Sequence, residues 1–337
     1  MSGKRLPRLD IQTRVNHSPH VVVLGAGASR ACCKEGDKNR VRLPLMADFI
    51  ELVGIETIIK KAGCSPEENF EKIYSEIHKK GAKQILNELD VAVRNYFGSL
   101  VLPDQPTLYD YLVLSLRPKD MIVTFNWDPL LNQAFKRWRH LGKVLPEIIF
   151  LHGNVDLGID VENKSYGFLS DQPKLTPTDL LYPVENKNYQ ANPFLEEQWR
   201  LATDYLGEAY YVTIFGYSAP KTDVEARSLL LNAWRRNPTR TLAQFSIVDI
   251  RNKNEVEASW TDFLDGVHGG ASSNILKSYL MRHPRRTCEA FAFATLQQTP
   301  WHEDRFPNAG SLQELEDWVK PLIEEEAKAE LSGEPHH

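Results

Sequence analysis

The stretch HVVVLGAGAS, residues 20–29, is an apolar run of strand length that ends in a glycine-rich turn. Three later stretches have the same form: MIVTFNWD at 121–128, IIFLHG at 148–153 and YVTIFGYS at 211–218. Apolar runs that stop abruptly in small or polar residues are typical of buried parallel strands, and ligands bind at the carboxyl edge of such sheets. The four stretches predict an α/β fold with a Rossmann-like, mostly parallel sheet and helices on both faces.

The glycine turn suits a phosphate group, because backbone N–H groups and a helix N-terminus approach an anion closely there. A Gly-x-Gly turn is also common without a ligand, so a purely structural role is an equal alternative. Arg30 and Ala31 stand where a dehydrogenase fingerprint has its third glycine. Residues 42–48 read RLPLMAD, a loop leading into a helix, where a second strand would end in an acid. An ordinary hydride-transfer domain is therefore disfavoured.

Three polar residues follow the second and third runs. Asn126 and Asp128 are one residue apart, so both side chains can face one ligand. The alternative is that they cap a helix predicted at 129–139, since Asp followed by Pro is a common helix start. His152 precedes a glycine that leaves its ring uncrowded, and an imidazole there can titrate near neutral pH and act as a base. A structural histidine is the alternative for His152 alone, but its place in the series favours function.

The motifs at 25–29, 124–128, 152–153 and 216–218 read Gly-Ala-Gly-Ala-Ser, Thr-x-Asn-x-Asp, His-Gly and Gly-x-Ser. In this order they resemble the NAD-binding core of the sirtuin family, and more closely the sirtuin-like domains of bacterial anti-phage defence proteins. The resemblance covers roughly residues 18–30, 40–50, 120–155 and 208–255.

The resemblance implies a role for each motif residue. Asn126 would hold the nicotinamide ribose and a water, Asp128 would face the carboxamide, and His152 would be the base on the ribose side. The residues implied to hold the NAD pyrophosphate are Gly25, Ala26, Gly27, Ala28 and Ser29. Those implied to contact the adenosine half are Gly216, Ser218 and, for the adenine ribose, Asp249 at the end of the predicted strand FSIVD at 245–249.

The chain also departs from the family pattern. Zinc-bearing sirtuins carry two Cys-x-x-Cys pairs, whereas the cysteines here are Cys32, Cys33, Cys64 and Cys288. Adjacent cysteines do not form the usual tetrahedral knuckle, so we expect no structural zinc and no other metal. Phe125 and Trp127 replace the residues that flank the motif asparagine in deacylases, and LMA at 45–47 replaces their Asp-Phe-Arg. These departures disfavour an acyl-lysine acceptor and favour water.

The resemblance and its departures together imply an NAD+ hydrolase that gives nicotinamide and ADP-ribose and depletes NAD in anti-phage defence as part of a regulated assembly. Two rivals stay open: an NAD-dependent protein deacylase, and a non-catalytic sensor module that binds NAD or ADP-ribose. The cysteine pattern counts against the first. The presence of both Asn126 and His152 counts against the second, because binding alone requires no base. Likeness to defence proteins further implies a homo-oligomer that docks on a HerA-type ATPase or an Argonaute-type subunit.

We expect three parts along the chain: a flexible basic arm at 1–18, a catalytic domain at 19–310, and an amphipathic helix with a tail at 311–337. Apolar residues at helical spacing predict helices at 46–63 and 66–98, within a helical lobe of about 46–118. A loop-rich insertion is expected at about 154–193.

Further helices are predicted at 194–206, 257–268, 272–282 and 312–331. The basic run RHPRR at 282–286 is read as a solvated surface turn in preference to a phosphate site.

Composition indicates a soluble intracellular enzyme. The 337 residues carry a formal net charge of −5, which gives no electrostatic case for direct nucleic-acid binding and counts against it. Four cysteines without paired spacing favour a reducing compartment. No apolar run approaches the roughly 20 residues of a membrane span, and the N-terminus has no signal-peptide core. We therefore expect a cytoplasmic protein that does not bind membranes.

Overall fold

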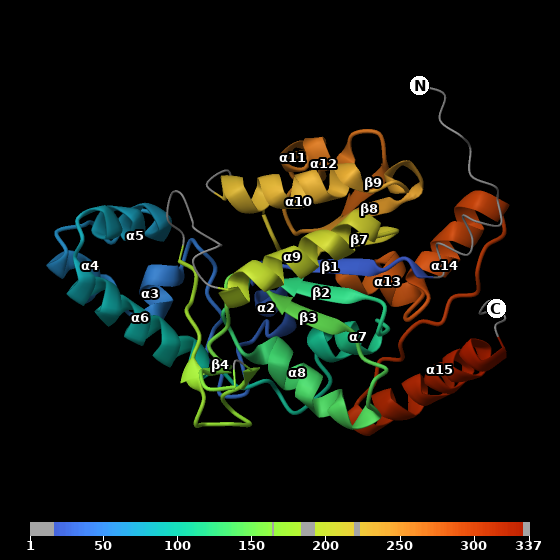
Figure 1. Ribbon diagram of the computed structural model, residues 1–337, viewed down its shortest axis with the longest axis horizontal. Helices are drawn as coiled ribbons and strands as arrows, with labels where there is room; N and C mark the ends of the chain where they lie inside the picture. The colour runs from blue at the N-terminus through green and yellow to red at the C-terminus, as the bar shows by residue number, and fades with distance from the viewer. Residues whose placement is uncertain (1–16, 164, 183–192, 219–222, 333–337) are drawn as a thin grey trace.

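Figure 1 shows the computed structural model, which describes residues 17–163, 165–182, 193–218 and 223–332. Its centre is a six-stranded sheet in which each neighbouring pair of strands is parallel. From edge to edge the strands are β3 (Glu147–Phe150), β2 (Met121–Thr124), β1 (His20–Leu24), β7 (Tyr211–Phe215), β8 (Gln244–Val248) and β9 (His268–Ser272). The predicted α/β fold with a mostly parallel, Rossmann-like sheet is confirmed.

Alternate side chains of β1 enter opposite cores, because successive side chains of a strand point to opposite faces. Val22 and Leu24 belong to one core, and Val21 and Val23 to the other. The first core is covered by α2 (Ala26–Cys32), α7 (Leu108–Leu114), α8 (Leu130–Trp138) and α15 (Leu312–Ser332). The second is covered by α9 (Pro193–Glu208), α10 (Val224–Arg236), α11 (Lys253–Ser259), α12 (Thr261–Leu264) and α14 (Thr287–Ala292). Helices therefore cover both faces, as predicted (Figure 1).

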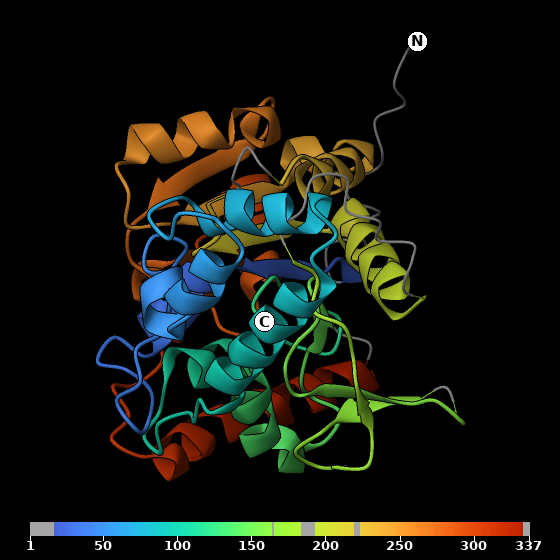
Figure 2. The same ribbon diagram turned by 90° about the vertical axis from the view of Figure 1, so that its left-hand side faces the viewer.

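A helical lobe stands beyond the carboxyl ends of the strands (Figure 1, Figure 2). Its helices are α3 (Phe49–Val53), α4 (Glu56–Lys61), α5 (Phe70–Lys79) and α6 (Lys83–Gly98). The ranges predicted to be helical, 46–63 and 66–98, are helical, and each is divided into two helices. Gly54 ends α3 in left-handed backbone with φ +73°, and Gly81, with φ +67°, lies in the turn between α5 and α6. The next helix, α7, contacts α2 and α8 beside the sheet.

Part of the segment expected to be loop-rich, 154–193, forms a second, antiparallel sheet. Its strands are β5 (Ser165–Phe168), β4 (Leu157–Asp160) and β6 (Thr176–Pro177). Lys136 of α8 holds this segment through ion pairs from Nζ to Asp156 (3.3 Å) and Asp171 (3.0 Å). Residues 164 and 183–192 of the insertion, and residues 1–16 of the expected arm, lie outside the described residues.

The helices predicted at 194–206 and 312–331 are confirmed as α9 and α15. Within the described ranges, none of the helices combines the length and the apolar character that crossing a membrane requires.

The segment after α12 departs most from its prediction. Helices are predicted at 257–268 and 272–282. The end of α11 and the whole of α12 occupy most of the first range, whereas the second holds a single helical turn at Ile275–Lys277 and the short helix α13 (Tyr279–Arg282), and the strand β9 lies between the two ranges. β9 lies at the edge of the sheet, pairs with β8 alone, and is partly exposed along its length. Its sequence, HGGAS, lacks the apolar run that identifies the inner strands, because an exposed edge does not require one.

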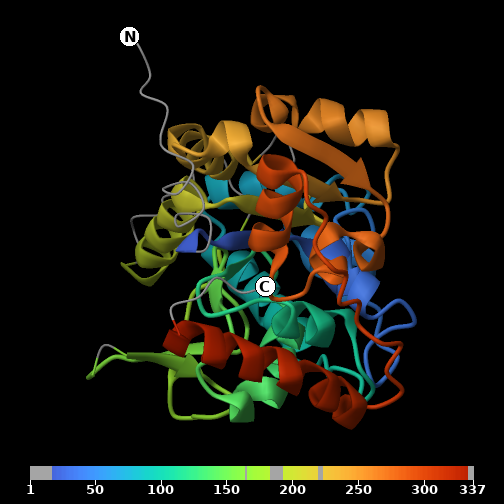
Figure 3. The ribbon, with the colours of Figure 1, turned by 90° about the vertical axis from the view of Figure 1, so that its right-hand side faces the viewer.

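The basic run at 282–286 is not the solvated surface turn that the sequence predicts. The side chain of Arg285 is buried, and its guanidinium donates from Nε and Nη2 to the two carboxylate oxygens of Glu326, each at 2.7 Å. It also donates to the carbonyl oxygens of Leu116 (3.0 Å) and Val144 (3.1 Å). Arg285 therefore fastens the terminal helix α15 to the body of the protein. Figure 3 shows this helix, in red, lying along the body.

We predict that Arg285→Met lowers the free energy of unfolding by about 3–5 kcal/mol, because it leaves the buried Glu326 carboxylate without its cation. Urea unfolding followed by circular dichroism measures this change. The control is Arg305→Met, since Arg305 pairs with Glu303 at the surface, where such a pair contributes about 0–1 kcal/mol. Similar losses in the two variants would contradict a structural role for the buried pair.

Candidate functional site

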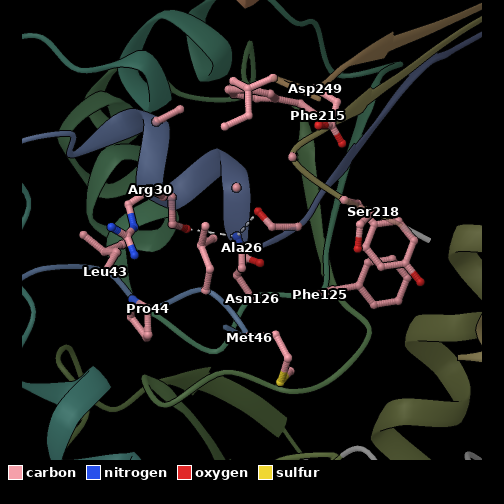
Figure 4. A pocket seen from close by; sticks show the side chains of 18 of the residues that line it. Ala26, Arg30, Leu43, Pro44, Met46, Phe125, Asn126, Phe215, Ser218 and Asp249 are labelled. Atoms are coloured by element: carbon pink, nitrogen blue, oxygen red, sulfur yellow. Dashed lines mark hydrogen bonds between the residues drawn. The ribbon is translucent and has the colours of Figure 1, made fainter. Parts of the chain in front are cut away.

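A cavity of about 1310 Å³ lies at the carboxyl edge of the sheet, where the lobe faces the strand ends. Its lining comes from the segments that follow β1, β2, β3, β7, β8 and β9. Residues 43–47, with Phe49 of α3 and Phe97 of α6, line it from the lobe side. In Figure 4, Asn126 and Met46 lie on one side of Ala26 and Asp249 lies on the other.

Nearly all the residues that the sequence singles out line this one cavity. They are Gly25, Ala26, Gly27, Ser29, Asn126, Asp128, His152, Gly216, Ser218 and Asp249. The exception is Ala28, which is fully buried in the core beneath the turn and forms no part of the lining.

The glycine turn after β1 packs directly on the turn after β7. The Gly25 N–H donates to the carbonyl of Phe215 (3.1 Å), and the Gly27 N–H donates to that of Gly216 (3.0 Å). Gly216 has φ +65°, and a Cβ there would lie 2.1 Å from the Ala28 nitrogen. The N–H groups of Gly25 and Gly27 therefore join the two turns. The glycine turn thus has the structural role that was the alternative to phosphate binding.

Below the turn, Ser29 is the centre of a buried hydrogen-bond network. Its Oγ donates to Oδ2 of Asp128 (2.7 Å), and because a hydroxyl has one hydrogen, it accepts from the Tyr109 hydroxyl (2.6 Å). Asn126 donates from Nδ2 to Ser29 Oγ and to the Gly25 carbonyl, both at 2.9 Å. The network fixes which way the Asn126 amide faces.

Asp128 lines the cavity and also caps a helix, which is the alternative role that the sequence left open. Its Oδ1 accepts from the Leu130 N–H (3.2 Å) at the start of α8, while Oδ2 accepts from Ser29. Burial raises the pKa of the Asp128 carboxyl, and the hydrogen bonds from Ser29 and Leu130 act in the opposite direction. Capping and cavity lining are therefore joint roles of one side chain.

Two further asparagines hold the backbone of this segment. Asn154 donates from Nδ2 to the Asp128 carbonyl (2.7 Å), and its Oδ1 accepts from Asn132 Nδ2 (3.1 Å). Both asparagines are fully buried. They fix the path of the chain on which Asn126 and Asp128 stand.

His152 follows β3 and presents a mostly buried ring to the cavity. Its Nε2 lies 3.9 Å from Oδ2 of Asp223, which also accepts from the Tyr217 hydroxyl (3.1 Å). The ring of Phe125 packs edge-on against the imidazole at 4.9 Å. The sequence suggested that the glycine after His152 leaves space for the imidazole. The structure gives a different reason for it: Gly153 has φ +74°, and a Cβ there would lie 2.4 Å from the backbone oxygen of residue 179.

The other side of the cavity is more open and charged. Asp249 comes directly after β8, one residue beyond the end of the strand. Arg251 donates to Oδ2 of Asp249 from Nη2 (2.7 Å) and Nε (3.0 Å). Ser218 lines the cavity next to residues 219–222, which lie outside the described residues.

Sequence reasoning missed several residues that build the site. Tyr109 and Asp223 sit on or beside helices, and nothing in their local sequence indicates their partners at Ser29 and His152. Arg30 also lines the cavity and pairs with Asp48 in the segment that joins the lobe. Only Asn154 offered a signal, since it comes two residues after His152.

The cysteines form no metal-binding group in the described part of the chain. Cys32 and Cys33 are adjacent at the end of α2, Cys64 lies in the loop after α4, Cys288 lies in α14, and each is a free thiol. No cluster of three or more His, Cys, Asp or Glu residues suited to a metal occurs among residues 17–163, 165–182, 193–218 and 223–332.

No family model matches the chain, and no curated protein matches it. Among solved structures, a Sir2 enzyme studied for mechanism and regulation is 13% identical, with 94% of this chain and 98% of that chain covered and a TM-score of 0.39. A Sir2 homolog in complex with NAD is 14% identical, with coverages of 86% and 97% and a TM-score of 0.39. The chain is distantly similar in structure to these Sir2 proteins.

We predict that Gly216→Ala lowers the free energy of unfolding by at least about 2 kcal/mol, because its Cβ would separate the two turns and break their hydrogen bonds. Gly81→Ala is a matched control: Gly81 has a similar φ of +67°, but a Cβ there meets no atom within 4 Å. It should cost about 1 kcal/mol, from backbone strain alone. Urea unfolding compares the two, and equal losses would show that the close contact contributes nothing.

Proposed function

We propose that the cavity binds NAD+ and that the protein hydrolyses the bond between nicotinamide and ribose. The observation that carries the proposal is the convergence of Asn126, Asp128 and His152 in one cavity with the glycine turn and with Asp249. Figure 4 places Asn126 and Asp249 on opposite sides of this turn. An extended dinucleotide suits that order, with a polar reaction end, a turn beside the pyrophosphate, and a group for the second ribose.

The chemistry needs positioning and a base. The scissile bond joins a positively charged nicotinamide to C1′ of ribose, so nicotinamide leaves with the bonding electron pair as a neutral molecule and needs no acid. The ribose becomes an oxocarbenium-like cation, and water adds to C1′ and loses a proton. The balance is NAD+ and water giving nicotinamide, ADP-ribose and one proton. The protein must orient the sugar and the water and accept that proton.

Asn126 is suited to orient them. Its Nδ2 hydrogens are engaged by Gly25 and Ser29, which leaves Oδ1 as the amide atom that would accept a hydrogen bond from a ribose hydroxyl or from water. Because both Nδ2 hydrogens are held by acceptors of the protein itself, the network keeps the amide in one orientation. Such preorganised groups are the usual source of positioning in enzymes.

His152 is suited to accept the proton. An imidazole is the side chain best matched to base catalysis near neutral pH. The Asp223 carboxylate at 3.9 Å would stabilise the imidazolium that forms, and the Phe125 ring restricts the plane of the imidazole. Asp223 is thus a positioning residue in this proposal.

Two features support water as the acceptor and a role in defence. Phe125 and Trp127, which depart from the deacylase pattern, both line the cavity. The motif resemblance to sirtuin-like domains of bacterial anti-phage defence proteins supports a role in which NAD is depleted. Such an activity has to be restrained in the absence of infection, which fits a regulated assembly.

We expect the purified protein to convert NAD+ into equal amounts of nicotinamide and ADP-ribose, followed by liquid chromatography. His152→Ala should lower kcat by about 10²–10⁴-fold, because it removes the base. His302→Ala is the control, since His302 has a side chain that is 86% exposed and lies outside the cavity lining. Unchanged turnover in His152→Ala would remove this residue from the mechanism.

An acetylated peptide in the same assay separates the rival functions. NAD-dependent loss of the acetyl group would replace the hydrolase by a deacylase. Binding of ADP-ribose without release of nicotinamide would replace it by a sensor module.

We further propose a homo-oligomer controlled by a HerA-type ATPase or an Argonaute-type subunit, on the support of the motif resemblance. Light scattering at micromolar concentration should show more than one chain per particle, and nicotinamide release should change when the partner is added. A monomer that is fully active alone would contradict this arrangement.

A further inference from the structure

The adenosine side of the cavity carries a cation that the proposed hydrolysis does not require. Arg251 donates to Oδ2 of Asp249 from two guanidinium nitrogens, and its backbone N–H donates to Oδ1 at 2.9 Å. Both residues line the cavity. The carboxylate suited to a ribose hydroxyl is therefore already paired with a guanidinium.

This pairing bears on whether the site suits a ribose with a 2′-hydroxyl or one with a 2′-phosphate. A carboxylate by itself accepts the 2′-hydroxyl of NAD+ and repels a 2′-phosphate, whereas a nearby arginine accommodates the phosphate. The planar guanidinium fork matches a phosphate in geometry as well as charge. Arg251 remains 35% exposed in its side chain, and within the described residues its Nη1 makes no hydrogen bond, so part of the fork is accessible to a ligand.

The neighbouring lining suits an adenosine. Ile250 and Leu276 line the cavity with apolar side chains that are 89% and 53% exposed, and a purine would cover them. Asn274 lines the same side, and its Oδ1 is engaged by the Leu276 N–H (2.9 Å), which leaves its amide nitrogen as a donor. Asp249 is the one carboxylate that the segments after β8 and β9 contribute to the lining described here, and it is paired.

We propose that the site accepts NADP+ as well as NAD+, with Arg251 as the residue that binds the 2′-phosphate. The inference rests on the proposed function, which puts the adenosine beside Asp249. The reaction is the same: water adds to C1′ as nicotinamide leaves, giving 2′-phospho-ADP-ribose and one proton.

The test compares two ratios, each of the 2′-phosphorylated compound to the plain one. The first is kcat/KM for NADP+ over that for NAD+. The second is the association constant of 2′-phospho-ADP-ribose over that of ADP-ribose, measured by calorimetry, which requires no cleavage. In the wild-type protein both ratios should lie within about 10-fold of one, because the cation offsets the repulsion from the carboxylate.

Arg251→Ala should lower both ratios by about 10- to 100-fold, since it removes a charge-assisted pair and leaves the Asp249 charge uncompensated. Asp249→Asn should raise both ratios, because it removes the repulsion and keeps the cation. The matched control is Lys253→Ala, which makes the same change of charge two residues away, at a side chain that is 66% exposed and outside the lining. It should leave both ratios unchanged.

The outcomes separate the two proposals. If ADP-ribose binds and NAD+ is cleaved, but Arg251→Ala leaves both ratios unchanged or the wild-type protein rejects the phosphorylated compounds by more than about 100-fold, the inference is overturned and the hydrolase stands. If neither ADP-ribose compound binds and neither dinucleotide is cleaved, the proposed function is overturned and the inference with it.

Discussion

The cavity depends on a contact between two backbones. The turns after β1 and β7 lie so close that a Cβ on Gly27 would be 2.8 Å from the Gly216 Cα, and a Cβ on Gly216 would be closer still to Ala28. From β1 the chain adds β2 and β3 on one side of the sheet, and from β7 it adds β8 and β9 on the other. The contact therefore lies at the switch point of the sheet, where the crevice for ligands opens in α/β folds of this kind.

The two sides of this crevice differ in physical character. On one side, Ser29, Asn126 and Asp128 are buried and joined by hydrogen bonds, which fix their positions. Low polarity around such a network strengthens each of its hydrogen bonds and makes a missing partner costly. On the other side, Asp249 and Arg251 are linked at a partly exposed site, where water and salt weaken their attraction and a ligand can compete for either. A fixed side suits bond cleavage, and an adaptable side suits the choice of substrate.

The sequence predicts buried strands well and exposed segments poorly, because a run of apolar residues appears only where a strand is buried. The runs at β1, β2 and β7 are apolar since both faces of the inner sheet are covered, and burial identifies them. The edge strand β3 is identified as well, because its second half is buried and continues into the apolar Leu151. The edge strand β9 has small, partly exposed residues, and the sequence does not predict it. The sequence predicts Arg285 at the surface because it lies in a basic run, and charged residues are mostly exposed. Its partner Glu326 is 41 residues away, so the local sequence does not reveal the buried pair.

The same distinction holds within the candidate site. Asn126, Asp128 and His152 could be identified because each follows a strand, whereas Tyr109 and Asp223 act through contacts that only the folded chain creates. At the glycine turn, the structural role and the proposed binding role do not exclude each other. Gly25 and Gly27 use their N–H groups to join the turn after β7, so an anion at this turn would meet the N–H of Ala26, which begins α2 and has no acceptor within the helix. In the proposed site the glycines would contribute clearance and Ala26 would contribute the donor, so the contact between the two turns would be the condition for binding.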